Sequence, residues 1–442
     1  MDLDRRTLLT RTTCALGAGV VAASCGSEDQ AAAGSADRAA WESYWAGIRR
    51  QFPLNTDDVH LSAMLIASHP QPVRQAIEWH RRALDASPAG YLQDNNGRLR
   101  EAALAAAGRY MGVDPRDIAL TDSTTMGVAL VYNGLMLRPG EEVLTTEQDY
   151  YVTHESLRLA AQRTGARVRK IAMYEDIRQV TPESLADRVL REIRPETRVL
   201  ALTWVHSSTG LKIPVRMIAD GLARINASRS PETQVLFGLD GVHGFGNQNQ
   251  MFGSLGCDFF MAGCHKWLFG PRGTGIIVAT PRGWAALRPS IPSFIDGESW
   301  TAWFENREPQ GASTAARMTP GGFKPYEHQW ALAEAFAFHE GIGPHLVQTR
   351  TEELATQLKE GLARMPNVTL QTPRRPDLSA GIVSFDVEGM TPAAVVKMLK
   401  ERRIIASVAP YATRHVRLTP CIYNSPADIE RALREVRAVA MV

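Results

Sequence analysis

Cysteine is scarce in this chain, because only five are spread over its 442 residues: Cys14, Cys25, Cys257, Cys264 and Cys421. The number is odd and no two have CxxC spacing, which argues against a disulfide framework and against a metal site. An excess of charge of one sign is also lacking, since 49 Lys and Arg residues nearly balance 47 Asp and Glu residues and leave a formal net charge of +2. This balance does not favour nucleic-acid binding or an acidic tail.

Long hydrophobic runs are lacking as well, and the apolar stretch at residues 14–24 is too short to span a bilayer. It follows Arg5 and Arg6 and leads into a segment of small residues. That order resembles a twin-arginine export signal, and "AASC", which ends at Cys25, resembles a lipoprotein cleavage site. We therefore expect residues 1–35 to be an export signal and linker, and the protein to be a surface or periplasmic lipoprotein with a membrane lipid anchor at Cys25. The alternative is a basic tail on a cytoplasmic protein.

The body of the chain alternates helical and strand patterns from about residue 75. Seven short runs rich in β-formers recur, and most gaps between them are long enough for a crossover helix. We therefore predict an α/β fold with a mainly parallel seven-stranded sheet covered by helices on both faces. The runs span residues 117–121, 141–146, 166–173, 198–205, 234–240, 257–263 and 273–280.

The pattern changes after about residue 330. Short strands are expected around "AGIVSFDV", "IIASVA" and "HVRLT", and helices at "TPAAVVKMLKERR" and "PADIERALREVRAVA". These elements predict a smaller α+β domain, and a chain of 442 residues is long enough to divide in this way. The expected organisation is a signal and linker, an N-terminal segment, a large α/β domain and a small domain, at residues 1–35, 36–75, 76–330 and 331–442.

Polar residues follow the predicted strands. Ligands of open α/β sheets bind outside the carboxyl ends of the strands, so these residues predict one pocket. They are Asp122 to Thr125, Asp149 to Tyr151, His206 to Ser208, Asp240 with His243, and His265 with Lys266.

Three features of this predicted pocket suit the parts of pyridoxal phosphate. Lys266, at the end of an apolar run, can form a Schiff base. Asp240 ends another apolar run, where a carboxylate can keep a pyridine nitrogen protonated. The segment "TDSTTMG" places hydroxyls and free backbone N–H groups at a helix start, which favours a phosphate. Taken singly, each feature has an ordinary alternative: a solvated lysine, a turn aspartate and a helix N-cap.

Together, "LDGVHGFG" and "AGCHKWLFGPRGTG" resemble the aspartate and lysine blocks of the class V aminotransferases, a branch of the fold-type I pyridoxal-phosphate enzymes. The resemblance covers roughly residues 40–440. It implies that pyridoxal 5'-phosphate is bound through Lys266, with Asp240 at the ring nitrogen and an amino acid as the substrate. The chain departs from the family at Gly263, because a hydroxyl residue often stands three positions before the lysine.

The resemblance also implies roles for the remaining site residues. Each is carried over from a matching position in a family motif, and a bidentate guanidinium suits the binding of a carboxylate. The implied roles are phosphate binding by Thr124, Thr125 and His265, stacking on the cofactor by Tyr150, contact with the phenolic oxygen by His243 and Ser207, and binding of the substrate carboxylate by Arg417.

Within the family, "DGVH" and "HKWLFGPRGTG" are most similar to the isopenicillin-N-epimerase-like group. The expected reaction begins with removal of the α-proton by Lys266, and leads to epimerisation or transamination; Tyr150 is a candidate acid or base on the opposite face. Cysteine desulfurases need a cysteine before the arginine, and "IIASVAPYATRHVR" has none. A carbon-sulfur or other β-lyase on the same site is the alternative, and a non-catalytic exported binding lipoprotein is a third hypothesis.

A homodimer with sites at the subunit boundary is also expected from the resemblance. "MTPGGFKPYEHQW" stands where a glycine–threonine pair commonly reaches the neighbouring subunit's phosphate, and Thr319 and Gly321 are the matching residues. Phe323, Tyr326 and Trp330 are the expected interface anchors. The alternative is a loop that packs on its own chain.

Overall fold

A single sheet of seven strands is the largest element of the computed structural model, which describes residues 27–441. Neighbouring strands are parallel except at β8, which runs antiparallel to both of its neighbours. The predicted mainly parallel sheet is thereby confirmed, and all seven predicted runs form its strands. Their spatial order is β2 (Ile118–Thr121), β8 (Gly275–Ala279), β7 (Phe259–Gly263), β6 (Leu236–Asp240), β5 (Thr197–Thr203), β3 (Glu142–Thr146) and β4 (Arg167–Ile171).

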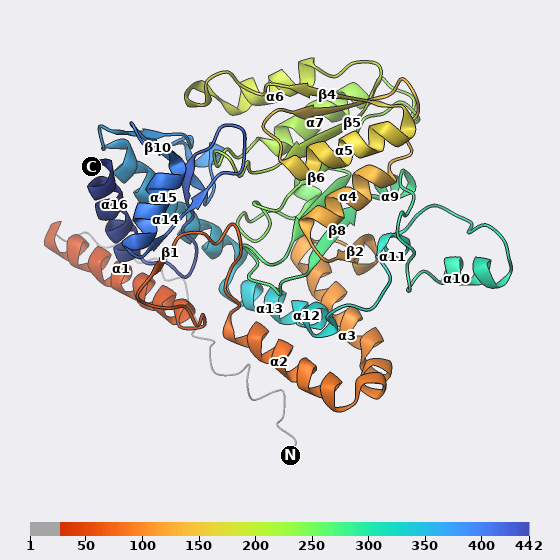
Figure 1. Ribbon diagram of the computed structural model, residues 1–442, viewed down its shortest axis with the longest axis horizontal. Helices are drawn as coiled ribbons and strands as arrows, with labels where there is room; N and C mark the ends of the chain where they lie inside the picture. The colour runs from red at the N-terminus through yellow and green to blue at the C-terminus, as the bar shows by residue number, and fades with distance from the viewer. Residues whose placement is uncertain (1–26, 442) are drawn as a thin grey trace. The chain divides into compact units, whose positions relative to one another are not determined.

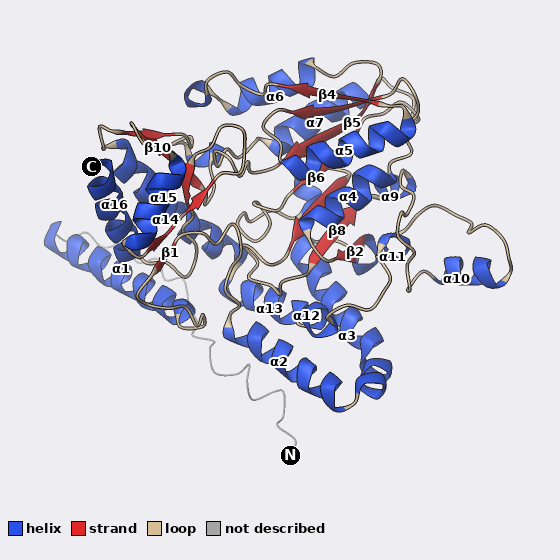
Figure 2. Cartoon of the chain, in the orientation of Figure 1, coloured by secondary structure: helices blue, strands red, loops and turns tan. Residues whose placement is uncertain are grey.

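Helices cover this sheet, as its burial pattern requires. Strands β2, β3, β7 and β8 are buried along their whole length, whereas the edge strand β4 is half exposed. Continuous apolar runs of this kind are typical of strands buried on both faces. Figures 1 and 2 show α4 (Thr124–Gly134) and α5 (Tyr151–Thr164) packed side by side against the sheet. The other crossover helices include α6 (Pro182–Arg191) and α7 (Val215–Asn226).

A second sheet of four antiparallel strands lies in the C-terminal part of the chain, as the sequence predicts. It has its own hydrophobic core, which also contains Val59 and Leu61 from the N-terminal part. The strands are β12 (Ser407–Val408), β13 (Val416–Leu418), β10 (Val383–Val387) and β9 (Val368–Leu370), and the helices are α14 (Pro344–Ala363), α15 (Pro392–Glu401) and α16 (Pro426–Ala440).

The N-terminal part of the chain joins this C-terminal part through a strand pair. Strand β1 (Val59–His60) runs parallel to β11 (Ile404–Ile405). Helix α1 (Ser27–Arg49) begins inside the segment that the sequence assigns to signal and linker, while Arg5, Arg6 and Cys25 lie outside the described residues. None of the described helices combines the length and apolar composition that a bilayer crossing requires.

The segment expected to form interface anchors packs partly inside its own chain. Trp330, at the end of α12 (Tyr326–Trp330), is 1% exposed and its indole N–H donates to Asn96 at 3.3 Å. A Cβ at Gly321 would lie 2.7 Å from the carbonyl oxygen of Pro292, so a glycine is needed there by a contact within the chain. Phe323 is 82% exposed and remains available as an anchor. Helix α12 packs against α2 (Gln71–Ala86), α3 (Pro88–Met111) and α13 (Leu332–Ile342). Three short helices are α8 (Phe252–Leu255), α9 (Pro281–Ala285) and α11 (Ala315–Met318).

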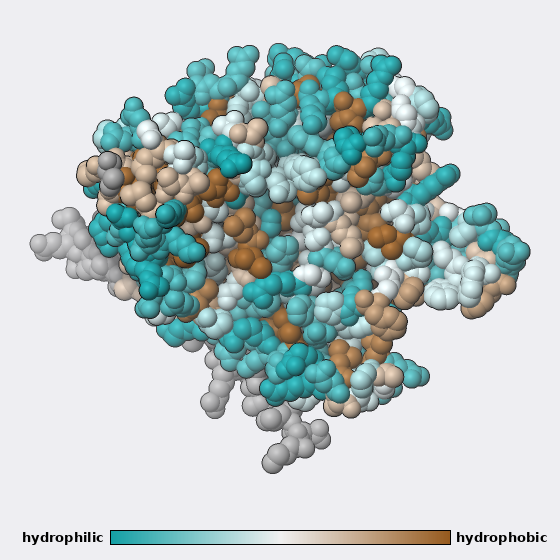
Figure 3. Space-filling view, in the orientation of Figure 1, coloured by the Kyte–Doolittle hydropathy of each residue, from teal (hydrophilic) through white to brown (hydrophobic). Residues whose placement is uncertain are grey.

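An arm at residues 288–311 carries α10 (Gly297–Phe304; Figure 1), and some of its aromatic side chains are exposed. Trp303 and Phe304 are 69% and 74% exposed. An ion pair joins Arg317 to Asp296, the N-cap residue of α10, at 2.9 Å. Figure 3 shows this arm projecting at the right of a mostly hydrophilic face that has separate hydrophobic patches.

Candidate active site

One cavity of about 280 Å³ contains all nine residues that the sequence predicts for the site. Most of them follow the carboxyl ends of strands of the large sheet, and the others come from the small sheet or begin a helix. They are Thr124 and Thr125 at the start of α4, Tyr150 just before α5, Ser207 after β5, Asp240 at the end of β6, His243, His265 and Lys266 in the loops after β6 and β7, and Arg417 in β13. The structure thus brings the nine residues together, while their roles stay predictions.

Two of the other polar residues at the strand ends, Asp149 and Tyr151, do not line this cavity. The Asp149 carboxylate instead accepts hydrogen bonds from the backbone N–H groups of Thr146 and Thr203, at 2.8 and 2.6 Å, and from the Thr145 hydroxyl. These hydrogen bonds therefore hold the turn that carries Tyr150. Tyr151 is 66% exposed.

The lysine and the aspartate have displaced pKa values. Burial lowers the pKa of Lys266 to about 8, and the Arg417 charge adds to this while Asp240 opposes it. Burial raises the pKa of Asp240 to about 6. Two weaker effects lower it: the N–H of Val242 donates a hydrogen bond to Oδ1 at 3.1 Å, and the Lys266 charge lies nearby. A lysine with this pKa is partly unprotonated near neutral pH, so it can act as a nucleophile or base.

The two imidazoles of the cavity are neutral at pH 7. Burial, with the charges of Lys266 and Arg417, holds the pKa of His243 well below its ordinary value, and burial lowers the pKa of His265 to about 4. The indole N–H of Trp267 donates to Nδ1 of His243 at 3.3 Å. Because an indole can only donate, Nε2 of His243 carries the proton.

The start of α4 and the His265 ring form one corner of the cavity, the anion-binding corner, whose groups suit a negative charge. Ser123 caps the helix, since its hydroxyl accepts from the N–H of Met126 at 3.1 Å. The free N–H groups of a helix N-terminus and the helix dipole favour a negative charge. His265 Nδ1 is buried with no hydrogen-bond partner among the described residues, and its ring lines the same cavity. These groups can hold a phosphate.

Arg417 is 1% exposed and is held rigidly by its neighbours. Its guanidinium donates to the Ser407 hydroxyl at 3.2 Å and to the carbonyl oxygens of Ser207 and Val408 at 2.8 and 2.9 Å. Burial lowers its pKa to about 10, which leaves it charged at neutral pH. Three of its five N–H groups are used in this way, and one remains on each terminal nitrogen for a bidentate carboxylate.

Sequence reasoning missed the polar residues Thr203 and Tyr411 and one apolar wall of the cavity. Tyr411 Oη lies 2.8 Å from Ser207 Oγ, and its ring centroid lies 5.6 Å from that of Tyr150. Its position in the loop before Arg417 was the one available signal. The apolar lining residues had no sequence signal, since they look like ordinary core residues; they are Met64, Leu65, Val152, Val242 and Pro410.

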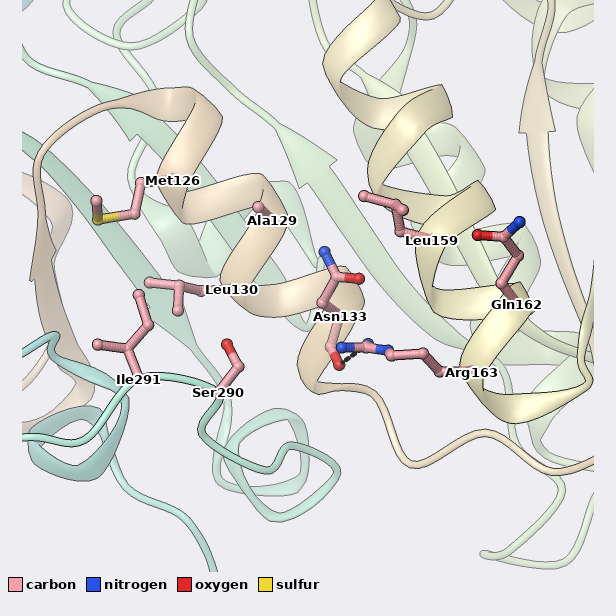
Figure 4. Close-up of a pocket in the computed structure, with 9 residues that line it drawn as sticks. All are labelled: Met126, Ala129, Leu130, Asn133, Leu159, Gln162, Arg163, Ser290 and Ile291. Carbon is pink, nitrogen blue, oxygen red and sulfur yellow. Dashed lines mark hydrogen bonds between the residues drawn. The ribbon is translucent and has the colours of Figure 1, made fainter.

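A second hollow, of about 380 Å³, lies between α4, α5 and residues 290–291 (Figure 4). It contains none of the predicted site residues. Its lining is mostly aliphatic, with Met126, Leu130 and Ile291 on one side, and its one charged group, Arg163, donates to the carbonyl oxygen of Asn133. Its lining lacks the lysine, aspartate and histidine side chains that line the first cavity.

The chain is similar to known proteins over most of its length. The model of the family described as "Aminotransferase class-V" matches residues 91–431. Isopenicillin N epimerase from Streptomyces clavuligerus is 28% identical over 400 residues, which cover 88% of this chain and 96% of the relative. A cysteine desulfurase from Serratia proteamaculans is 24% identical over 361 residues, which cover 77% of this chain and 82% of the relative.

Solved structures share the fold. A cystine C-S lyase in complex with its product cysteine persulfide has a TM-score of 0.75 at 22% identity, with 88% of this chain and 99% of that chain covered. The apo structure of a cysteine desulfurase from Thermococcus onnurineus has a TM-score of 0.76 at 18% identity, with 90% and 98% covered. These identities show the fold alone.

Proposed function

Because the chain belongs to the class V aminotransferase family, we propose that it is a pyridoxal-phosphate enzyme that acts at the α-carbon of an amino acid through Lys266. One observation carries the proposal. A single cavity holds a lysine whose pKa is lowered to about 8, a buried aspartate and a buried arginine with two free N–H groups.

The residues of the cavity fit this cofactor. The unpartnered Nδ1 of His265 and the α4 N-terminus suit a phosphate, and the Asp240 carboxylate, with its raised pKa, suits a hydrogen bond to a pyridine nitrogen. The residues that would hold pyridoxal phosphate are Thr124, Thr125 and His265 at the phosphate, Asp240 at the ring nitrogen, His243 and Ser207 at the phenolic oxygen, Tyr150 on the ring face and Lys266 at the aldehyde carbon.

When bound, pyridoxal phosphate supplies an electron sink that stabilises negative charge at the α-carbon of an amino acid. The chain's own residues orient the substrate and move its α-proton. Arg417 binds the α-carboxylate through its two free N–H groups and fixes the α-carbon near Lys266. Nζ of Lys266 then accepts the α-proton, and the Asp240 carboxylate supports the positive charge of the ring nitrogen.

Epimerisation is the outcome that we favour. It requires return of the proton to the opposite face of the α-carbon, for which Tyr150 is the candidate donor, and it consumes no other reactant. Transamination uses the same residues with a different site of proton return. A carbon-sulfur or other β-lyase is the alternative, since it needs only the first proton transfer and a β-substituent that can leave. A binding protein without turnover is the third hypothesis.

Formation of a persulfide on the enzyme is disfavoured by the thiols of the described residues. Cys257, Cys264 and Cys421 are all buried, and burial raises the pKa values of Cys264 and Cys421 to about 12. None of the three lines the cavity. A thiol of this kind is a poor nucleophile, because the thiolate is the reactive form.

The test is product analysis with a panel of L- and D-amino acids in deuterated water. Chiral chromatography and mass spectrometry distinguish the outcomes: an inverted, deuterated amino acid for epimerisation, a keto acid for transamination, and an α-keto fragment with a released β-group for elimination. Binding without any of these products would favour the binding protein.

We also propose that the enzyme is a homodimer and that it is exported. The dimer is supported by the exposed aromatic side chains of α10 and by Phe323, and sedimentation of the purified protein tests it. Export, with a lipid anchor at Cys25, rests on the sequence of residues 1–35 alone. Replacement of Arg5 and Arg6 by lysine, followed by cell fractionation, tests the signal.

A further inference from the structure

The segment at residues 61–67 crosses the site from the arginine end to the lysine end. The N–H of Thr419, two residues after Arg417, donates to the carbonyl oxygen of Leu61 at 2.8 Å. The N–H of Ala67 donates to the carbonyl oxygen of His265, the residue before Lys266, at 3.1 Å. The segment therefore runs from the backbone of the strand that carries Arg417 to the backbone next to Lys266.

This segment presents apolar side chains to the cavity. Met64 is 2% exposed and Leu65 is 46% exposed, and both line the cavity. Val152 and Pro410 are apolar members of the same lining. Leu65 thus keeps nearly half of its surface in water at the cavity wall, and an apolar group placed against it would gain free energy from burial.

The described residues that line the cavity leave no charge over for a charged substrate side chain. Among the sixteen lining residues only Lys266, Asp240 and Arg417 carry a charge, since both imidazoles are neutral at pH 7. The proposed function already uses these three. A carboxylate or ammonium on the substrate side chain would lose water against Met64 and Leu65 without gaining a partner, which is costly.

We infer that the substrate is an amino acid with an uncharged, apolar side chain, which packs against Met64 and Leu65. This inference rests on the proposed function and adds the class of substrate to it. Leu65 is the specificity-determining residue, because it combines a place in the lining with an exposed surface that tolerates substitution.

The experiment compares leucine, methionine and phenylalanine with aspartate, glutamate and lysine on the holoenzyme. Exchange of the α-proton into deuterated water gives kcat/KM for each, and calorimetry gives the affinity for α-methyl-leucine and α-methyl-glutamate, which have no α-proton to lose. We expect the apolar amino acids to exchange at least about tenfold better, the scale on which a pocket discriminates apolar groups. We expect the same preference in binding.

A second experiment compares an arginine substitution at Leu65 with the same substitution at its neighbour Ile66, which is the control. Leu65→Arg should lower kcat/KM for leucine by about tenfold or more and raise it for glutamate, because the new guanidinium removes apolar surface and supplies a partner for a carboxylate. Ile66→Arg, at a residue that is 52% exposed and does not line the cavity, should change neither value.

Faster exchange or tighter binding with the charged amino acids would overturn the inference and leave the proposed function standing. Equal effects of Leu65→Arg and Ile66→Arg would also overturn it, because Leu65 would then be covered by something other than the substrate. Absence of exchange with every amino acid, together with no binding of either α-methyl analogue, would overturn the proposed function itself.

Discussion

The hydroxyl of Thr124 accepts a hydrogen bond from the backbone N–H of Gly263 at 2.8 Å. This bond joins the N-terminus of α4, where a phosphate is expected, to the end of the strand that leads to Lys266. The absence of a side chain at Gly263 makes the contact possible, because a Cβ there would lie 2.9 Å from Thr124 Oγ1 and 2.9 Å from Cε1 of His265. The departure from the family at Gly263 thus has a steric reason in this chain.

Gly263→Ser should therefore weaken cofactor binding, although it restores the residue type common in the family. The added atoms displace Thr124 or His265 from the anion-binding corner, at a cost of about 1–3 kcal/mol for overpacking, or roughly tenfold in affinity. Titration of the cofactor-free protein with pyridoxal phosphate measures this. Gly253→Ala is the control, since a Cβ at Gly253 meets no atom within 4 Å. Unchanged affinity in Gly263→Ser would show that the corner does not hold the phosphate.

Cofactor capture by Lys266 should depend on pH with a midpoint near 8, because only the unprotonated amine attacks an aldehyde and burial lowers the pKa of Lys266 to about 8. The rate should fall as pH drops below this value. Stopped-flow mixing of cofactor-free protein with pyridoxal phosphate measures it.

Two variants should shift the midpoint pH of cofactor capture in opposite directions. Arg417→Met removes a positive charge that lowers the lysine pKa, so the midpoint should rise; Asp240→Asn removes a negative charge that raises it, so the midpoint should fall. A wild-type midpoint near the ordinary lysine value of 10.5 would contradict the burial of the amine.

Much of the fold was predictable from the sequence because buried parallel strands leave continuous apolar runs. All seven runs form the large sheet, and eight of the nine site residues meet because each follows a strand end or begins a helix at one edge of it, whereas Arg417 comes from β13 of the small sheet. The antiparallel direction of β8 and the pairing of β1 with β11 were not predictable, since both depend on long-range packing.

The parts of the site that the sequence did not predict come from segments without a motif. Met64 and Leu65 look like core residues, and only their hydrogen-bonded path between Thr419 and His265 places them in the cavity. The expectation that Trp330 anchors an interface was wrong, because the indole fills a gap within its own chain. Large aromatic residues suit both environments equally well.

Asp240→Asn should slow α-proton exchange by about 10²-fold or more, which is the scale of a lost electrostatic contact in the transition state. The amide has almost the shape of the carboxylate but cannot support a positive charge on the ring nitrogen. Proton NMR of a substrate in deuterated water gives the exchange rate, and cofactor content must be measured on the same sample. Near-normal exchange at full cofactor content would remove Asp240 from the proposed role.

Tyr411→Phe should lower kcat/KM about fivefold while keeping the ring beside Tyr150. The lost hydroxyl bonds to Ser207 at 2.8 Å, and the Ser207 carbonyl in turn holds Arg417, so the substrate carboxylate should be held less firmly. A hydrogen bond of this kind contributes about 0.5–1.5 kcal/mol. Tyr151→Phe, at an exposed neighbour outside the cavity, is the control. Equal kinetics for the two variants would exclude a positioning role for Tyr411.

The attachment of the cofactor to Lys266 is tested most directly by reduction with borohydride, digestion and peptide mass spectrometry. We expect the reduced pyridoxyl phosphate group on the peptide that contains Lys266, and we expect Lys266→Ala to give no labelled peptide and no activity. A labelled peptide at any other lysine of the wild-type protein, or full activity of Lys266→Ala, would contradict it.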